Sequence, residues 1–105
     1  MKSRMTSNDL ARFLGEKRGC NIFVFGSWLK SASPSDVDLL LVYDEARHSP
    51  SDFLQVSKLI GDMLRRYFAR PVHLVRLTVR EEAEVRFVER EGCVPLVDIL
   101  QHGDV

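Results

Sequence analysis

The sequence predicts an α/β (α+β) domain in which short apolar strands alternate with amphipathic helices. Two apolar, β-rich runs, Ile22 to Phe25 and Val37 to Tyr43, are joined by a short polar segment. After Pro50 the hydrophobic residues recur with the helical period, and a third apolar run begins at Val72. With 105 residues the chain is long enough for one hydrophobic core, so we expect a single domain, residues 1–105.

The N-terminal part predicts a helix followed by a strand. Hydrophobic residues recur at helical spacing from Leu10, and Ser7 or Asn8 is expected to cap this helix, which ends near Gly19. Cys20 to Phe25 predicts the first strand, buried at the centre of a sheet. The second apolar run then forms the neighbouring strand.

The middle of the chain predicts a long helix and a third strand. Ser49, with Pro50 after it and an acid at Asp52, is typical of a helix start. The hydrophobic period then extends the helix to about Ala69, with either Leu59 or Ile60 facing the core. A strand follows after an Arg-Pro pair that breaks the helix.

The C-terminal part predicts a further helix and a short apolar end. Thr78 to Glu81 has the pattern of a capping box, and it predicts one helix to about Glu91. The acidic residues of this helix are expected to form a solvated surface with nearby arginines. Cys93 to Val97 is either a last strand or a packed tail, and Leu96 to Leu100 starts a final helical turn.

Composition narrows the class of protein. Lys and Arg number 15, as do Asp and Glu, and this absence of a basic excess argues against nucleic acid as a partner. Cys20 and Cys93 have no metal-ligand spacing, so we expect two half-buried, reduced thiols rather than a disulfide. Because no signal-like or membrane-spanning run occurs, the expected location is the cytoplasm.

The candidate site lies between the first two strands. Asp36 and Asp38 are two residues apart, so on a strand both carboxylates point to the same face. Like charges at this spacing repel, and a divalent cation between them would relieve the repulsion, since hard oxygen ligands suit Mg²⁺. Gly26 allows a close backbone approach, and Ser27 adds an N–H group and a hydroxyl that suit phosphate. The pattern therefore predicts a site for a metal–nucleotide complex.

This pattern resembles a known signature. Gly26-Ser27, the spacer 28–35 and then Asp36-Val37-Asp38 are similar to the motif of the DNA polymerase β-like nucleotidyltransferase superfamily. The small size resembles the minimal nucleotidyltransferases, some of which are antitoxins beside HEPN-domain toxins. The resemblance implies the polymerase-β-like fold, with a small mixed β-sheet flanked by helices. It also implies transfer of a nucleoside monophosphate, from ATP or another nucleoside triphosphate, to a hydroxyl of a partner protein such as a HEPN-type toxin.

The resemblance also implies roles for particular residues. The Gly-Ser pair would hold the triphosphate, while Asp36 and Asp38 would be catalytic ligands of Mg²⁺ or Mn²⁺. Lys30 and Ser35 are further candidates for nucleotide contact, the alternatives being a solvated lysine and a serine that satisfies its own turn. Trp28 stands where many relatives carry an arginine, and it stacks against a base, contacts a partner or covers the edge of the core.

His73 is the main departure from the family pattern. The families carry a third catalytic carboxylate at this place on the strand, where it helps to hold the metal on the nucleophile side. A neutral imidazole is a poor Mg²⁺ ligand, although it accepts Mn²⁺ or Zn²⁺. Three interpretations stay open: a general base beside a single metal, a ligand of a softer metal, or a site that has lost its chemistry and keeps binding or a purely structural role, with His73 packed near a carboxylate.

The alternative function class is a binding module without catalysis. Such a module would act as an antitoxin by direct protein contact or as a homo-oligomeric scaffold, and His73 is the feature that suggests it. A third interpretation, a polymerase acting on polynucleotide ends, needs a basic groove that the balanced charge does not predict.

Overall fold

Four strands form one mixed sheet in the order β3-β2-β1-β4. The computed structural model describes Thr6, Asp9, Leu10, Arg12, residues 20–26, Leu29 and residues 36–103, with side chains as far as residue 100. The strands are β1 (Cys20–Phe25), β2 (Val37–Tyr43), β3 (Val72–Thr78) and β4 (Val94–Pro95). β1 pairs antiparallel with β2 and with β4, whereas β2 and β3 are parallel. The described residues therefore form an α+β domain, as the alternation of apolar runs and helical periods predicted.

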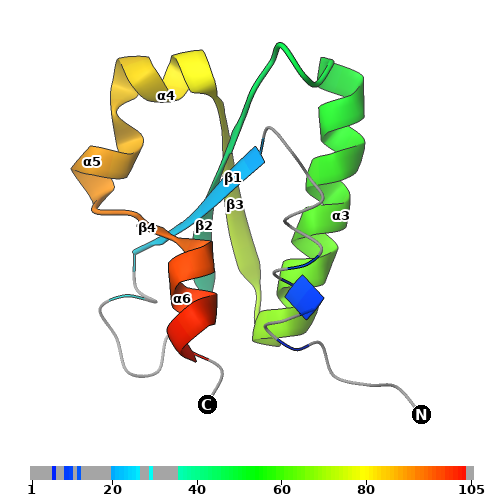
Figure 1. Cartoon of the computed structure of the whole chain (residues 1–105), viewed down its shortest axis with the longest axis vertical. Coiled ribbons are helices and arrows are strands. Elements are labelled where there is room, and N and C mark those ends of the chain that lie inside the picture. The colour runs from blue at the N-terminus through cyan, green and yellow to red at the C-terminus, as the bar shows by residue number, and fades with distance from the viewer. Residues whose placement is uncertain are drawn as a thin grey trace.

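Helices lie on both sides of this sheet. The helices are α3 (Pro50–Phe68), α4 (Val79–Val85), α5 (Phe87–Glu91) and α6 (Leu96–Gly103). α3 lies along one side of the strands, and α4 and α5 lie on the other side (Figure 1). The long helix α3 supplies the crossover that two parallel neighbours, β2 and β3, require.

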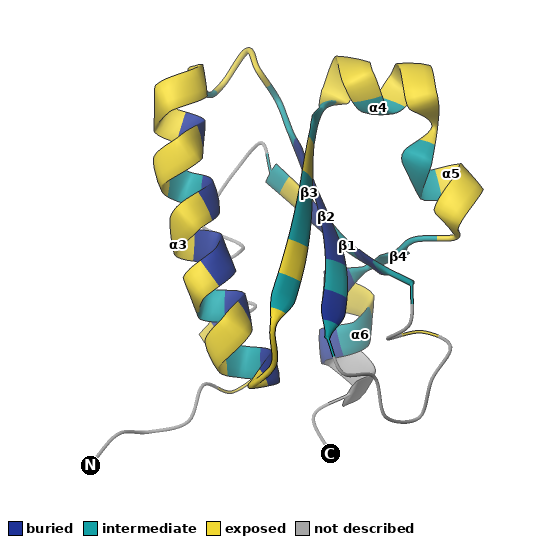
Figure 2. Ribbon diagram, turned by 180° about the vertical axis from the view of Figure 1, so that it is seen from behind, coloured by how far each residue is buried: buried dark blue, intermediate teal, exposed yellow. Residues whose placement is uncertain are grey.

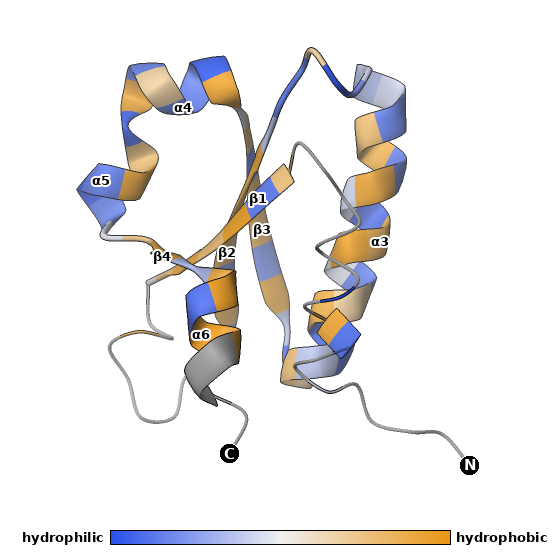
Figure 3. Ribbon diagram, viewed as in Figure 1, coloured by the Kyte–Doolittle hydropathy of each residue, from blue (hydrophilic) through white to orange (hydrophobic). Residues whose placement is uncertain are grey.

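The main core lies between the sheet and α3. Val37, Leu39 and Leu41 alternate along β2 and are fully buried in this core, together with Ile60 and Leu64 of α3. The buried residues of α3 face the strands, and its exposed residues face away (Figure 2). Hydrophobic residues also follow β1 and β2 through the middle of the molecule (Figure 3). The alternation along β2 thus fixes which face the two aspartates occupy.

The ends of α3 confirm the capping pattern of the sequence. The Asp52 backbone N–H donates to Ser49 Oγ at 3.2 Å, and Pro50 occupies the first turn. The helix stops at Ala69, whose left-handed backbone (φ 56°) directs its N–H to the Arg65 carbonyl. Ile60 is the core residue of the two alternatives, because Leu59 is 50% exposed.

The predicted single helix from Thr78 to about Glu91 is wrong. The capping box is present, with Thr78 and Glu81 exchanging side-chain and backbone hydrogen bonds. The chain then breaks at Arg86, whose φ of 53° is left-handed, so that α4 and α5 are separate. The Val88 N–H donates to the Glu82 carboxylate across the break at 2.9 Å. Tertiary packing explains the break, because the change of direction at Arg86 lets Phe87 pack against Phe25 of β1. The centroids of the two rings are 4.9 Å apart.

Expectations at the two ends are resolved in part. Asp9 and Leu10 are helical, and the Asp9 N–H donates to Thr6 Oγ1 at 3.1 Å, whereas the predicted caps Ser7 and Asn8 lie outside the described residues. Asp9 is three residues after Thr6, and its carboxylate returns a bond to the Thr6 N–H. At the other end, the apolar segment after Cys93 is a short strand, β4, and α6 is longer than the single predicted turn.

No helix in the described part of the chain is long and apolar enough to cross a membrane. Cys20 and Cys93 form no disulfide among the described residues, as their spacing predicted. The salt bridge between Arg86 and Glu89, at 3.5 Å, confirms local ion pairing on the acidic surface of α4 and α5.

Candidate functional site

Strand pairing brings three predicted site residues to one face and one end of the sheet. Asp38 is paired with Phe25 across the antiparallel ladder and with His73 across the parallel ladder. Residues directly opposite each other share a face, so the Asp38 and His73 side chains lie on the face opposite the main core. Asp36 comes two residues earlier and is brought to the same place.

Gly26 lies close to the Asp38 carboxylate. Its φ is +76°, and a Cβ atom built at this position would lie 2.6 Å from Asp38 Oδ2. The Leu29 N–H donates to the Gly26 carbonyl at 3.1 Å, so a turn begins where β1 ends. Only glycine combines this backbone conformation with such a close approach to a carboxylate. The geometry therefore requires the glycine that the sequence motif supplied.

Asp36 and His73 are in direct contact. His73 Nε2 donates to Asp36 Oδ2 at 3.0 Å. The side chain of Asp36 is 36% exposed and that of His73 is 64% exposed, so water and small ligands can reach both groups. The Val37 N–H donates to the Pro71 carbonyl at 3.0 Å, which extends the pairing of β2 and β3 up to the contact. His73, which stands where the resemblance implies a third carboxylate, thus contacts Asp36.

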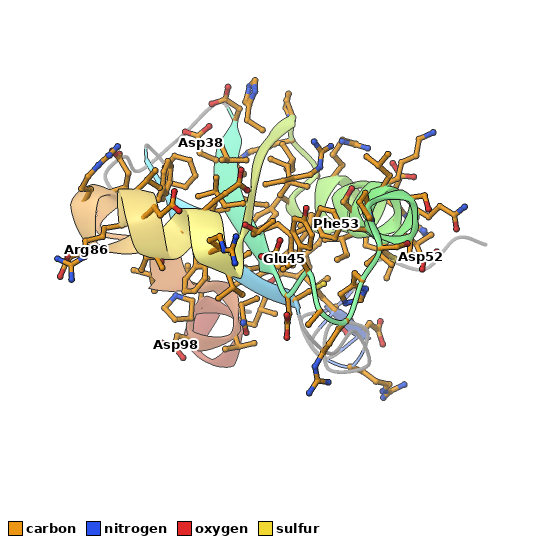
Figure 4. All side chains as sticks on the ribbon, turned by 90° about the horizontal axis from the view of Figure 1, so that it is seen from above. Asp38, Glu45, Asp52, Phe53, Arg86 and Asp98 are labelled. Atoms are coloured by element: carbon orange, nitrogen blue, oxygen red, sulfur yellow. The ribbon has the colours of Figure 1, made fainter. Side chains whose placement is uncertain are left out.

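Three predicted nucleotide-binding residues, Ser27, Lys30 and Ser35, lie outside the described residues, as does Trp28. The described part of the site consists of Gly26, Asp36, Asp38 and His73. It joins the end of β1, the start of β2 and the start of β3. Asp38 points to the opposite side of the molecule from Asp98 of α6 (Figure 4).

The donor set fits a hard divalent cation in part. Asp36 and Asp38 offer carboxylate oxygens on one face, which is the ligand chemistry of Mg²⁺. Among the described residues no three His, Cys, Asp or Glu side chains are close enough to hold a metal ion together. Two carboxylates are therefore available, and one of them already accepts a hydrogen bond from the imidazole.

Acids on the following helix are too remote to supply the third carboxylate that the resemblance implies. Thr78, where α4 is capped, pairs with Tyr43, five residues along the ladder from the His73–Asp38 pair. Five residues of strand span about 17 Å. Glu81 is also engaged in the capping box, so its carboxylate is already bonded away from the site.

The sequence did not predict an aromatic pair that lies beside Asp38. Phe87 of α5 contacts Phe25, whose strand partner is Asp38, so an edge-to-face aromatic pair lies on the same face as the carboxylate. The helical period at Phe87 gave no signal of this contact, because it depends on the break at Arg86.

In comparisons with known proteins, no protein-family model, no curated protein and no solved structure matches this chain. The motif residues that the structure brings together are Gly26 beside Asp38, and His73 bonded to Asp36.

Proposed function

We propose that this chain is a minimal nucleotidyltransferase of the polymerase-β-like fold. It transfers a nucleoside monophosphate to a hydroxyl of a partner protein such as a HEPN-type toxin. The preferred donor in this proposal is ATP, and the group transferred is then AMP. The observation that carries the proposal is the approach of the Gly26 backbone to the Asp38 carboxylate, where a Cβ atom would come within 2.6 Å of Oδ2. A backbone turn beside an acidic strand start supports binding of phosphate together with a cation.

Each residue has a role in this proposal. The turn at Gly26 and Ser27 would receive the triphosphate, and Asp36 and Asp38 would hold Mg²⁺ or Mn²⁺. A bound cation neutralises charge on the triphosphate and lowers the pKa of the attacking hydroxyl. The acceptor oxygen forms a bond to the α-phosphorus, the bond from that phosphorus to the bridging oxygen breaks, and pyrophosphate leaves. The hydroxyl proton passes to His73 through Nδ1, the ring nitrogen that does not bond Asp36.

One observation favours a second candidate function, a binding module without catalysis. His73 uses an oxygen of Asp36 that a cation on the nucleophile side would need. Such a site would bind a nucleotide through Asp38 and Gly26, and it would act as an antitoxin through direct protein contact. The two candidates differ in whether group transfer occurs, and they share the nucleotide site.

A transfer assay distinguishes the two functions. The chain is incubated with ATP radiolabelled at the α-phosphate, with Mg²⁺ or Mn²⁺, and with a protein extract as the source of acceptors. We expect the wild-type chain to label a protein, and we expect Asp36→Asn/Asp38→Asn and His73→Ala to abolish the label.

The variant His73→Asp shows how a lack of labelling by the wild-type chain is to be interpreted. Labelling by His73→Asp alone would show that the wild-type site has lost its chemistry and would support the binding module. No labelling by either protein, with both folded, would contradict the transferase proposal.

A further inference from the structure

Cys20 and His48 form a half-buried pair at the end of the sheet away from the candidate site. Cys20 begins β1 opposite Tyr43, whereas Asp38 is opposite Phe25 at the other end of the same ladder. Cys20 Sγ lies 3.7 Å from His48 Nε2, and 28 residues separate the two in sequence. The fold, rather than local sequence, therefore brings the thiol to the imidazole.

His48 is held in place both through its backbone and through its ring. Its backbone N–H donates to the Asp44 carbonyl at 3.2 Å, which closes the turn after β2. Its ring meets Phe53 edge-on, with centroids 6.5 Å apart, and Phe53 in turn stacks on Tyr43 at 3.6 Å. A nucleophile whose neighbouring base is held in place by further groups is the arrangement that activates a thiol.

Cys93 provides a contrast within the same chain. Burial raises the pKa of the Cys93 thiol, and the negative charges of Glu91 and Glu82 raise it further. Its Sγ donates to the Phe87 carbonyl at 3.9 Å, and both acids disfavour the thiolate. Because the thiolate is the nucleophile, we expect Cys93 to react slowly.

We propose that Cys20, with His48 as its proton acceptor, is a thiol modification site that forms a mixed disulfide with a low-molecular-weight disulfide. The S–H proton moves to His48 Nε2, in the tautomer protonated at Nδ1. The thiolate of Cys20 bonds to one sulfur of the small molecule, whose own S–S bond breaks. The other sulfur leaves as a thiolate and takes up the proton, so the exchange balances without a further oxidant.

Reaction with oxidised glutathione tests the proposal on the full, reduced chain at neutral pH. Mass spectrometry of proteolytic peptides measures the rate of adduct formation at each cysteine. We expect Cys20 to react at least about tenfold faster than Cys93. His48→Gln should slow the reaction of Cys20 by a similar factor and leave the rate at Cys93 unchanged.

Two results would overturn the proposal: equal or faster reaction at Cys93, or an unchanged rate at Cys20 in a folded His48→Gln protein. The denatured wild-type chain is the reference, because both cysteines should then react at similar rates. If His48→Gln does not fold, the ratio of the two rates in the native wild-type protein, compared with that reference, decides. The variant Cys93→Ala should keep the fast reaction and thereby assign it to Cys20.

Discussion

Glycine at position 26 both ends a strand and leaves room for the Asp38 carboxylate at the candidate site. The left-handed backbone at Gly26 ends β1, and the missing Cβ leaves the Asp38 carboxylate in its place. The sequence motif predicted this pair, because glycine followed by acids at alternate strand positions has a direct geometric meaning. A contact of His73 with a carboxylate was one of the open interpretations, but the motif did not single out Asp36, because that contact depends on the register of two strands that are distant in sequence.

Replacement of Gly26 by alanine should separate stability from ligand binding. Alanine at this φ costs about 1 kcal/mol of unfolding free energy, and its Cβ forces the Asp38 carboxylate to move. We therefore expect the affinity for a metal–nucleotide complex to fall at least about tenfold. Denaturant unfolding and calorimetric titration measure the two quantities.

Gly92→Ala is the matched control for this prediction. Gly92 also has a positive φ, of 63°, but nothing lies within 4 Å of an added Cβ. The same loss of stability is expected, with unchanged nucleotide affinity. Equal affinity in the two variants would show that the Asp38 carboxylate plays no part in the site.

At the scale of elements, the capping patterns of the sequence correctly predicted where α3 and α4 begin. Ser49 and Thr78 cap the helices that their patterns indicated, because a hydroxyl bonded to a backbone N–H three residues later is a local interaction. The break at Arg86 was not predictable in the same way. A non-glycine residue with φ of 53° is held there by tertiary contacts, including that between Phe87 and Phe25.

The end of α3 offers a test of backbone strain. Ala69 is exposed and left-handed, with φ of 56°, so Ala69→Gly removes a steric cost without removing a buried side chain. We expect the unfolding free energy to rise by about 0.5–1 kcal/mol. The exposed Ala46 has no positive φ, and Ala46→Gly should instead lower stability through the entropy of the unfolded chain. Equal effects in both variants would contradict the assigned helix end.

At the scale of the whole molecule, the described residues bury apolar groups on both faces of the sheet. Leu39 faces the core below α3, and Leu40 faces the side of α4 and α5, yet both are fully buried. The radius of gyration of 13.6 Å is close to the value of about 13 Å expected for a compact chain of this length. The helices on the two sides therefore pack against the same sheet, and the described residues form one unit.

Leu39→Ala and Leu40→Ala test whether the two faces contribute alike. Each change leaves a cavity at a fully buried site of β2, so each should lower the unfolding free energy by about 2–5 kcal/mol. Both proteins should still unfold in one cooperative transition. A cost below 1 kcal/mol for Leu40→Ala would mean that α4 and α5 are only loosely packed.

The central claim is that Gly26, Asp36 and Asp38 form a site for a metal–nucleotide complex. Calorimetric titration of a non-hydrolysable ATP analogue, with Mg²⁺ or Mn²⁺ present, tests it without knowledge of the acceptor. We expect saturable binding that requires the cation and disappears in Asp36→Asn/Asp38→Asn, with both proteins folded by circular dichroism. No binding with either cation, or equal binding by the double variant, would contradict the claim.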